Sequence, residues 1–511
     1  MSLQSLGTRA FWSTARLAAI FGSTLFALGA PSNAAEINVV KAETVGMSSE
    51  RLERIGVGMR RLIDADKIPG TVTLVARRGK VVHFETNGMR DVAKSLPMEK
   101  DTIFRLYSQT KPVTGAAVMM LFEEGHFLLS DPISKYLPEF KDMVVYVGTK
   151  DGKVQTEPAR PITIHHLLTH TSGMTYSLFP TPVGQLYRDA FIDASSAPII
   201  QTDPQTGKRS VLSDEDDPER HGTLKEWSET AAQLPLVAQP GTEWNYSVSI
   251  DVLGRLVEVI SGQTYRDFLK LRLFDPLGMS DTDFYVPEEK MSRFATNYVP
   301  NPKGGLAAID DAANSYYRTP PAIAFGGSGL VGTVGDFLKF AQMLANQGEY
   351  EGRRYLGSKT VEFMMQNHLP PIFPDDPVSS LKKVVELYGG APQGRAWGLG
   401  FGVAGSVVTN PATYGLPVSK GTYSWGGAAT THFWVDHEEQ LVMLVHTQLV
   451  PDGTYPVAEL MQLLTYQPHK DAHGAWVLVW RDLLSPILRL MGCQYQRVLT
   501  VGAARLRPIF G

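Results

Sequence analysis

Residues 104–125 read FRLYSQTKPVTGAAVMMLFEEG, and this stretch combines a helix signal with two chemically active side chains. Proline is tolerated in a helix only in the first turn, so Pro112 predicts a helix start close to Ser108. The apolar spacing of Val113–Glu124 favours a helix, and the glycine that follows is a natural C-terminal stop. Ser108 and Lys111 are three residues apart and therefore share a face of the first turn.

A serine hydroxyl is a poor nucleophile unless a base removes its proton, and a lysine is a base only when it is neutral. Burial can depress a lysine pKa from about 10.4 to about 7, which corresponds to roughly 4–5 kcal/mol between the two protonation states. The alternative is a serine that caps the helix beside a solvated lysine. The motif alone leaves both interpretations open, because Ser-x-x-Lys recurs at Ser379/Lys382 and at Ser380/Lys383.

Two further segments favour the catalytic interpretation. Pro240–Val248 (PGTEWNYSV) places Tyr246 after a turn and before an apolar helix that starts near Asp251. Tyr423–Ala428 (YSWGGA) contains a glycine pair that leads into a strand. Paired glycines let a backbone N–H approach a ligand closely, and such N–H groups form oxyanion holes.

Strand signals lie near the two ends of the chain. Thr71–Ala76 and Val81–Thr86 flank a short basic turn, and Thr431–Val435 and Gln440–Thr447 give a second hairpin signal. Between them the sequence shows mostly helical spacing and loops. This order predicts an α+β fold, in which one antiparallel sheet built from N- and C-terminal strands lies beside a mainly helical region of roughly residues 100–390.

These ordered blocks resemble the serine β-lactamase and penicillin-recognising family, and most of all its class C β-lactamase-like branch, the family VIII esterases. The resemblance runs from about Glu43 to Tyr466. It implies a β-lactamase/transpeptidase-like domain over about residues 43–467. The other blocks that carry it are ITIHHLLTHTSGM (Ile162–Met174), DPLGMSDT, GGSGLVGTVGDFLKFAQML and WGGAATTHFWVD.

The resemblance also implies roles for individual residues. Ser108 would be the nucleophile, Lys111 its base and Tyr246 the residue that shuttles protons. The backbone N–H groups of Ser108 and Ala428 would form the oxyanion hole, and no metal or organic cofactor is required. The residues expected to shape the substrate pocket are Tyr107, Val248, Trp425, Gly426 and Gly427.

Two positions depart from the pattern of the β-lactamases and peptidases. Val248 stands where they usually have asparagine, and Trp425 stands where their third motif usually begins with Lys or His. A cation there helps to hold a substrate carboxylate, whereas tryptophan offers apolar contact area. Both changes favour a neutral, apolar ester as the small-molecule substrate. We therefore expect a carboxylesterase that acts through an acyl-enzyme, and a transesterase if another alcohol enters.

Two other functions stay open at this point. The first is a β-lactamase or D-amino-acid peptidase with the same chemistry, and the second is a non-catalytic, membrane-associated binding protein.

Gly326–Gly329 (GGSG) resembles a nucleophile elbow, but Leu330 occupies the position of its final glycine, which favours a tight backbone turn. His165, His166 and His170 cluster without thiols, so we interpret them as structural.

Composition limits the partners. The 511 residues carry a net charge of −4, so no basic field recruits nucleic acid across the whole surface. The one cysteine excludes an intrachain disulfide framework and cysteine-cluster metal sites. The sequence does not determine the oligomeric state.

The two ends of the chain and one insertion stand apart from the domain. Residues 1–34, with an apolar run at Leu17–Ala30, predict a signal peptide and hence a periplasmic or secreted protein, with a mitochondrial presequence as the alternative. Gly474–Gly511 has the pattern of a basic amphipathic tail, which can contact a membrane surface or dock on protein. The Tyr176–Glu226 insertion, with a polar surface loop at Asp203–Gly222, would form part of the cleft wall.

Overall fold

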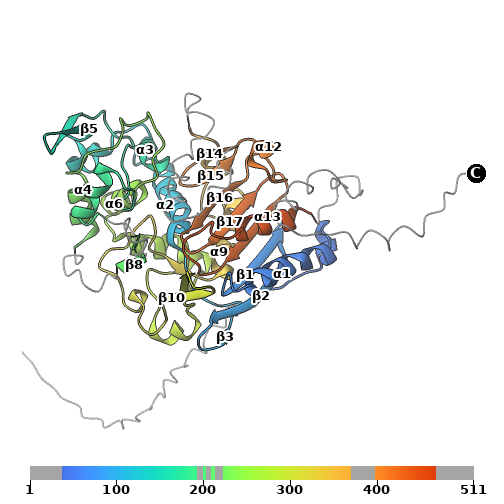
Figure 1. The fold of residues 1–511 in the computed structure, drawn as a ribbon. Helices are drawn as coiled ribbons and strands as arrows, with labels where there is room; N and C mark the ends of the chain where they lie inside the picture. The colour runs from blue at the N-terminus through green and yellow to red at the C-terminus, as the bar shows by residue number, and fades with distance from the viewer. Residues whose placement is uncertain (1–36, 193–198, 203–208, 213–221, 370–397, 468–511) are drawn as a thin grey trace, which may run out of the picture. The chain divides into compact units, whose positions relative to one another are not determined.

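The largest element of the fold is an antiparallel sheet of eight strands, shown in the computed structural model of Figure 1. Its strand order is β14-β15-β16-β17-β18-β1-β2-β3. The strands are β1 (Gly70–Arg77), β2 (Lys80–Asp91), β3 (Leu96–Pro97), β14 (Leu399–Phe401), β15 (Ser406–Val408), β16 (Tyr423–Gly427), β17 (Thr431–Asp436) and β18 (Leu441–His446).

The two ends of the domain meet inside this sheet. The last strand, β18, pairs with the first, β1, so that Leu74 lies opposite Leu444. Both predicted hairpins are present, as β1–β2 and β17–β18. The α+β prediction, with one sheet assembled from both ends of the chain, is therefore confirmed.

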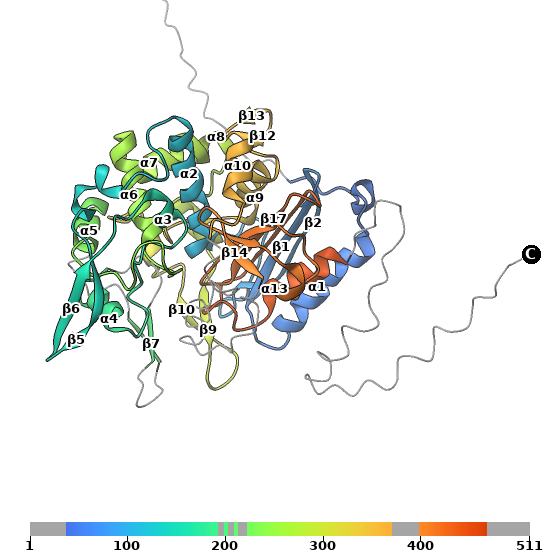
Figure 2. The ribbon, with the colours of Figure 1, turned by 90° about the horizontal axis from the view of Figure 1, so that it is seen from above.

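Side chains on the central strands alternate between two faces, as the pleat of a strand requires. Leu74 and Leu444 belong to the large core cluster that includes α9, whereas Val75 and Met443 pack in a second cluster with α1 and α13. Figure 2 shows α1 and α13 side by side on one side of the sheet and α9 on the other. The three covering helices are α1 (Ser49–Ile63), α9 (Val334–Ala345) and α13 (Val457–Tyr466).

A helical region lies beside the sheet, and α2 (Lys111–Glu123) runs between the two in Figure 1. Side chains from Lys111 to Leu121 are buried all round this helix, because it packs on α6 (Ser249–Ser261) and its Gly115 lies against Val403 and Ala404, between β14 and β15. The remaining helices are α3 (Ile164–Leu168), α4 (Pro182–Asp189), α5 (Leu224–Ala231), α6 (Ser249–Ser261), α7 (Tyr265–Leu269), α8 (Asp275–Leu277), α10 (Ser358–Met364) and α12 (Pro411–Tyr414).

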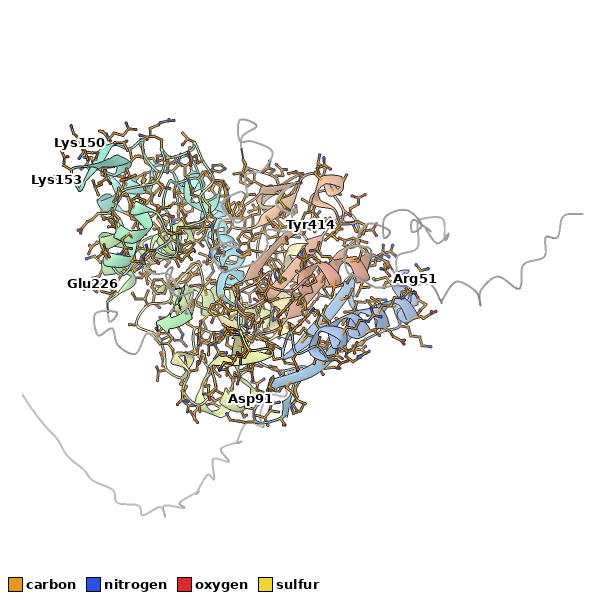
Figure 3. All side chains as sticks on the ribbon, viewed as in Figure 1. Arg51, Asp91, Lys150, Lys153, Glu226 and Tyr414 are labelled. Atoms are coloured by element: carbon orange, nitrogen blue, oxygen red, sulfur yellow. The ribbon has the colours of Figure 1, made fainter. Side chains whose placement is uncertain are left out.

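The structure also contains short two-stranded sheets that are separate from the large sheet. Figure 3 shows Lys150 and Lys153 at the tip of one of them, the β5–β6 hairpin, where they face each other. Arg209–Leu212 is also a strand, although the sequence predicted a loop there. The pairs are β5 (Val144–Lys150) with β6 (Lys153–Pro158), β7 (Ile199–Thr202) with β8 (Arg209–Leu212), β9 (Asn297–Pro300) with β10 (Leu306–Asp310), β4 (Phe104–Arg105) with β11 (Val331–Gly332), and β12 (Glu349–Tyr350) with β13 (Arg353–Arg354).

The structure describes residues 37–192, 199–202, 209–212, 222–369 and 398–467. The predicted signal peptide, most of the predicted polar loop, the second and third Ser-x-x-Lys motifs and the basic tail lie outside these residues. Within the described ranges, none of the helices has both the length and the apolar character needed to cross a membrane.

Candidate active site

Ser108 lies in a turn with an unusual backbone conformation. Tyr107–Thr110 forms a 3-10 turn, and the α-helix proper begins only at Lys111, slightly later than the proline predicted. Tyr107 has a φ of +44°, a left-handed conformation that costs a non-glycine residue about 1–3 kcal/mol. Its buried ring packs in a cluster with Val450, and its hydroxyl accepts a hydrogen bond from Asn297 Nδ2 at 3.0 Å. Tertiary contacts thus hold the turn that presents Ser108.

Two donors converge on the hydroxyl oxygen of Ser108. Lys111 Nζ lies 3.1 Å from Ser108 Oγ, and the Tyr246 hydroxyl lies 2.6 Å from it. The Lys111 side chain is fully buried, and its Nζ also donates to the carbonyl oxygen of Gly327 at 2.7 Å. A buried amine within hydrogen-bonding distance of a serine hydroxyl has the geometry that a general base needs.

Aromatic rings surround the lysine and hold the Tyr246 phenol in place. The Tyr246 ring stacks on Trp244 with centroids 6.1 Å apart and lies 4.9 Å from His170 and 5.1 Å from Tyr176. Lys111 Nζ lies 4.7 Å from the centre of the Tyr246 ring and 5.5 Å from that of Tyr176. These rings separate the amine from bulk water and fix its direction toward the serine.

The end of β16 lies directly against the turn that carries the serine. A Cβ atom built on Gly427 would stand 2.2 Å from the carbonyl oxygen of Leu106 and 2.5 Å from Thr431 Oγ1. Only glycine permits this approach, which the Thr431 hydroxyl supports by donating to the Leu106 carbonyl at 3.2 Å. The strand end therefore brings the backbone of Ala428 to the residues that precede Ser108.

The remaining candidates for the substrate pocket differ in their contacts and their burial. The Trp425 ring lies 5.7 Å from Tyr246 and 5.3 Å from Phe401, and no described group hydrogen-bonds to its buried indole N–H. Gly426 lies beside the ring of His432 on the same sheet. Val248 is fully buried in the core at the start of α6. The structure thus places the Trp425 ring beside Tyr246, whereas Val248 belongs to the buried core.

Three residues of this site escaped the sequence-based prediction: Tyr176, Asp251 and Gly327. Asp251, in the first turn of α6, accepts a hydrogen bond from the Gly327 N–H at 2.7 Å. Burial raises the pKa of the Asp251 carboxyl to about 7, although Lys111 acts in the opposite direction. The glycine pair of the GGSG motif was a visible signal, but nothing in the sequence linked it to the lysine.

The three histidines of the central motif make separate contacts. His165 Nε2 and His368 Nδ1 are 3.0 Å apart, His166 accepts a hydrogen bond from the Thr163 N–H, and His170 pairs with Ser247 at 3.1 Å. Across the described ranges, no three or more His, Cys, Asp or Glu side chains form a group that could hold a metal ion.

The chain is similar to known proteins over most of its length. The family model described as Beta-lactamase matches residues 59–465. Esterase EstB of Burkholderia gladioli is 30% identical over 451 residues, which cover 85% of this chain and 95% of the relative. Protein Rv1367c of Mycobacterium tuberculosis is 33% identical over 424 residues, which cover 80% of this chain and 95% of the relative.

Among solved structures, one described as EstCE1, a hydrolase with promiscuous acyltransferase activity, is similar to this chain. It has a TM-score of 0.65 and 26% sequence identity, and the match covers 82% of this chain and 99% of that one.

Proposed function

This chain belongs to the beta-lactamase family, and from that premise we propose that it is a serine hydrolase that cleaves carboxylic esters through an acyl-enzyme on Ser108. The observation that carries the proposal is the pair of hydrogen bonds that Lys111 and Tyr246 direct at Ser108 Oγ. A relative that matches over most of its length is named an esterase, which supports an ester as the substrate.

In the acylation step, neutral Lys111 takes the hydroxyl proton while Ser108 Oγ attacks the ester carbonyl carbon. The N–H groups of Ser108 and Ala428 stabilise the oxyanion of the tetrahedral intermediate, and each such donor contributes about 10²- to 10³-fold. The intermediate collapses when the carbon–oxygen bond to the alcohol breaks. The departing alkoxide takes a proton from the Lys111 ammonium, by way of the Tyr246 hydroxyl.

Deacylation repeats the same steps with water as the nucleophile. Lys111 removes a proton from water, by way of the Tyr246 hydroxyl, as the water oxygen attacks the acyl carbonyl carbon. The bond between that carbon and Ser108 Oγ then breaks, and Oγ takes up the proton. A second alcohol that enters in place of water receives the acyl group instead. Transesterification is therefore a second activity of the same site, and the promiscuous acyltransferase activity ascribed to EstCE1 supports it.

Substrate charge separates this proposal from a β-lactamase or a peptidase. Trp425 cannot pair with a carboxylate, and loss of a hydrogen bond to a charged group costs about 1.5–3 kcal/mol. We expect kcat/KM on a neutral p-nitrophenyl ester to exceed that on nitrocefin, which carries a carboxylate, by about 10- to 100-fold or more. A series of p-nitrophenyl esters of increasing acyl length, run beside nitrocefin and a D-alanyl-D-alanine peptide, measures this ratio.

An equal or higher kcat/KM on nitrocefin or on the peptide would instead assign the chain to the alternative chemistry.

The variant that tests the role of Trp425 is Trp425→Phe, which keeps an apolar ring beside Tyr246 and Phe401 and removes the indole N–H. If apolar contact is the role of Trp425, this variant retains the preference for neutral esters.

We also propose that the protein acts outside the cytosol. The apolar run Leu17–Ala30 and the small residues at Ser32 and Ala34 support export with cleavage after Ala34. Expression of the full chain in a bacterial host should yield a periplasmic product whose first residue is Ala35, which intact-mass measurement can identify. Retention of an uncleaved chain in the cytosol would contradict export and favour the mitochondrial alternative.

A further inference from the structure

The Gly326–Gly327 segment supplies two backbone acceptors to α2. Thr114 Oγ1 donates to the carbonyl oxygen of Gly326 at 2.5 Å, and Lys111 Nζ donates to that of Gly327 at 2.7 Å. The turn predicted from the GGSG motif thus lies on the N-terminal half of the helix that carries the lysine. The carbonyl oxygen of Gly327 is therefore an acceptor for the lysine amine in addition to Ser108 Oγ.

Asp251 fixes this segment from the other side. Its Oδ1 accepts the Gly327 N–H at 2.7 Å, and a Cβ built on Gly327 would stand 2.6 Å from Oδ2 and 2.9 Å from Oδ1. The carboxyl therefore lies directly on the glycine, and no larger residue would fit between them. Asp251 is fully buried, and its Oδ2 has no hydrogen-bond partner among the described residues. Buried carboxyl oxygens are rarely left without a partner, so this one calls for an explanation beyond packing.

Two other titratable groups near the lysine and this carboxyl, His170 and Tyr265, have pKa values that burial displaces in favour of the uncharged form. Burial and the charge of Lys111 lower the pKa of His170 well below its usual range. Burial raises the pKa of Tyr265 far above its usual range, and the Tyr265 hydroxyl lies 2.6 Å from Thr114 Oγ1. The phenols of Tyr176 and Tyr246 complete the surroundings of the amine. Among these groups, Asp251 is the carboxyl whose charge interacts with that of Lys111.

We propose that Asp251 is a positioning residue for the base, through Gly327. It fixes the carbonyl that directs Lys111 Nζ at Ser108, and its ionised form favours the protonated amine. The carboxylate thereby sets the pH above which Lys111 can accept the serine proton. This inference rests on the proposed function, since it assigns the partner of the base in that same site.

Asp251→Asn separates charge from position. The amide oxygen can still accept the Gly327 N–H, and the amide nitrogen takes the place of the oxygen that has no partner. Without the negative charge, the ammonium form of Lys111 loses a favourable electrostatic interaction. The acid limb of the kcat/KM profile on a p-nitrophenyl ester should then move to lower pH by about one unit, with the plateau within about tenfold of wild type.

Asp251→Ala removes the acceptor as well as the charge. The Gly327 N–H is then unsatisfied and its carbonyl is free to shift, so kcat should fall by about 10- to 100-fold. KM should stay unchanged, because Asp251 acts on the base through Gly327. A purely structural aspartate would instead lower the thermal midpoint of both variants and leave the acid limb where it is.

Asp336→Asn is the matched control. Asp336 is also a buried aspartate in the first helical turn, accepts a distant backbone N–H, from Asp281 at 2.7 Å, and has a pKa raised by burial. This variant should change stability and leave the acid limb unmoved. An acid limb that is the same in Asp251→Asn and wild type, or that moves equally in Asp336→Asn, would overturn the inference.

A second readout distinguishes failure of this inference from failure of the proposed function. A fluorophosphonate labels an activated serine without ester turnover, so its rate of reaction with Ser108 can be followed against pH in the same variants. Absence of labelling and of turnover in wild type would overturn the proposed function together with this inference. Normal wild-type labelling with no displacement of its pH dependence in Asp251→Asn would overturn only the role of Asp251.

Discussion

Replacing Ser108 by alanine is expected to lower kcat on a p-nitrophenyl ester by about 10⁵- to 10⁶-fold, while KM changes little. The change removes only the hydroxyl that accepts hydrogen bonds from Lys111 and Tyr246, so the turn and α2 should keep their positions. No other side chain changes, which is why substrate binding should survive. Steady-state kinetics with the purified variant, beside a circular dichroism spectrum and a thermal midpoint, measures the effect.

Ser380→Ala is the sequence-matched control for this variant. Ser380 belongs to another Ser-x-x-Lys motif, with Lys383, but no proline follows that lysine as Pro112 follows Lys111. The control should retain wild-type turnover. Turnover that survives Ser108→Ala, or disappears in Ser380→Ala, would assign the nucleophile elsewhere.

Replacing Lys111 by methionine or by arginine should lower kcat by about 10³- to 10⁴-fold. Methionine has a similar length and is itself uncharged, but it cannot accept a proton. Arginine keeps the positive charge, and its pKa above about 12 prevents it from acting as a base. Near-equal losses in both variants would therefore identify proton transfer as the role of Lys111. Substantial activity in Lys111→Arg would show that the positive charge alone is needed.

Tyr246→Phe tests the remaining candidate for the base. Phenylalanine keeps the ring contacts with Trp244 and His170 and removes the hydroxyl that lies 2.6 Å from Ser108 Oγ. We expect a loss of about 10²-fold, smaller than that of Lys111→Met, because the tyrosine relays a proton that the lysine takes. A larger loss in Tyr246→Phe than in Lys111→Met would assign the base to the tyrosine.

Local sequence signals predicted the elements well where one short segment contains the whole signal. The hairpin at Gly70–Asp91 has β-rich runs on both sides of a turn, and α2 has a proline at its start and a glycine at its end. The prediction that strands from both ends share one sheet also holds, because β18 pairs with β1. The β5–β6 hairpin was not predicted, although the apolar run of β5 and the Asp151-Gly152 turn are visible signals, because its second strand, β6, is exposed and mostly polar.

The same difference between local and distant signals applies to the residues of the site. Ser108 and Lys111 share a helical turn, so their spacing alone predicted that they lie together. Tyr246 comes from 138 residues further along the chain, and only the resemblance of its motif to a known family suggested that it meets Ser108. The contact of Asp251 with Gly327 joins residues 76 apart and follows from how α6 packs on α2, which no local pattern encodes.

The acyl-enzyme on Ser108 is the central claim, and its direct observation is the most decisive measurement. Wild type would be mixed with a p-nitrophenyl ester, quenched with acid during turnover, and analysed by intact and peptide-level mass spectrometry. The mechanism predicts a mass increase of one acyl group, confined to the peptide that carries Ser108 and absent from Ser108→Ala. An acyl group on another residue, or steady turnover with no adduct from the earliest quench times onward even with a slowly deacylating ester, would contradict it.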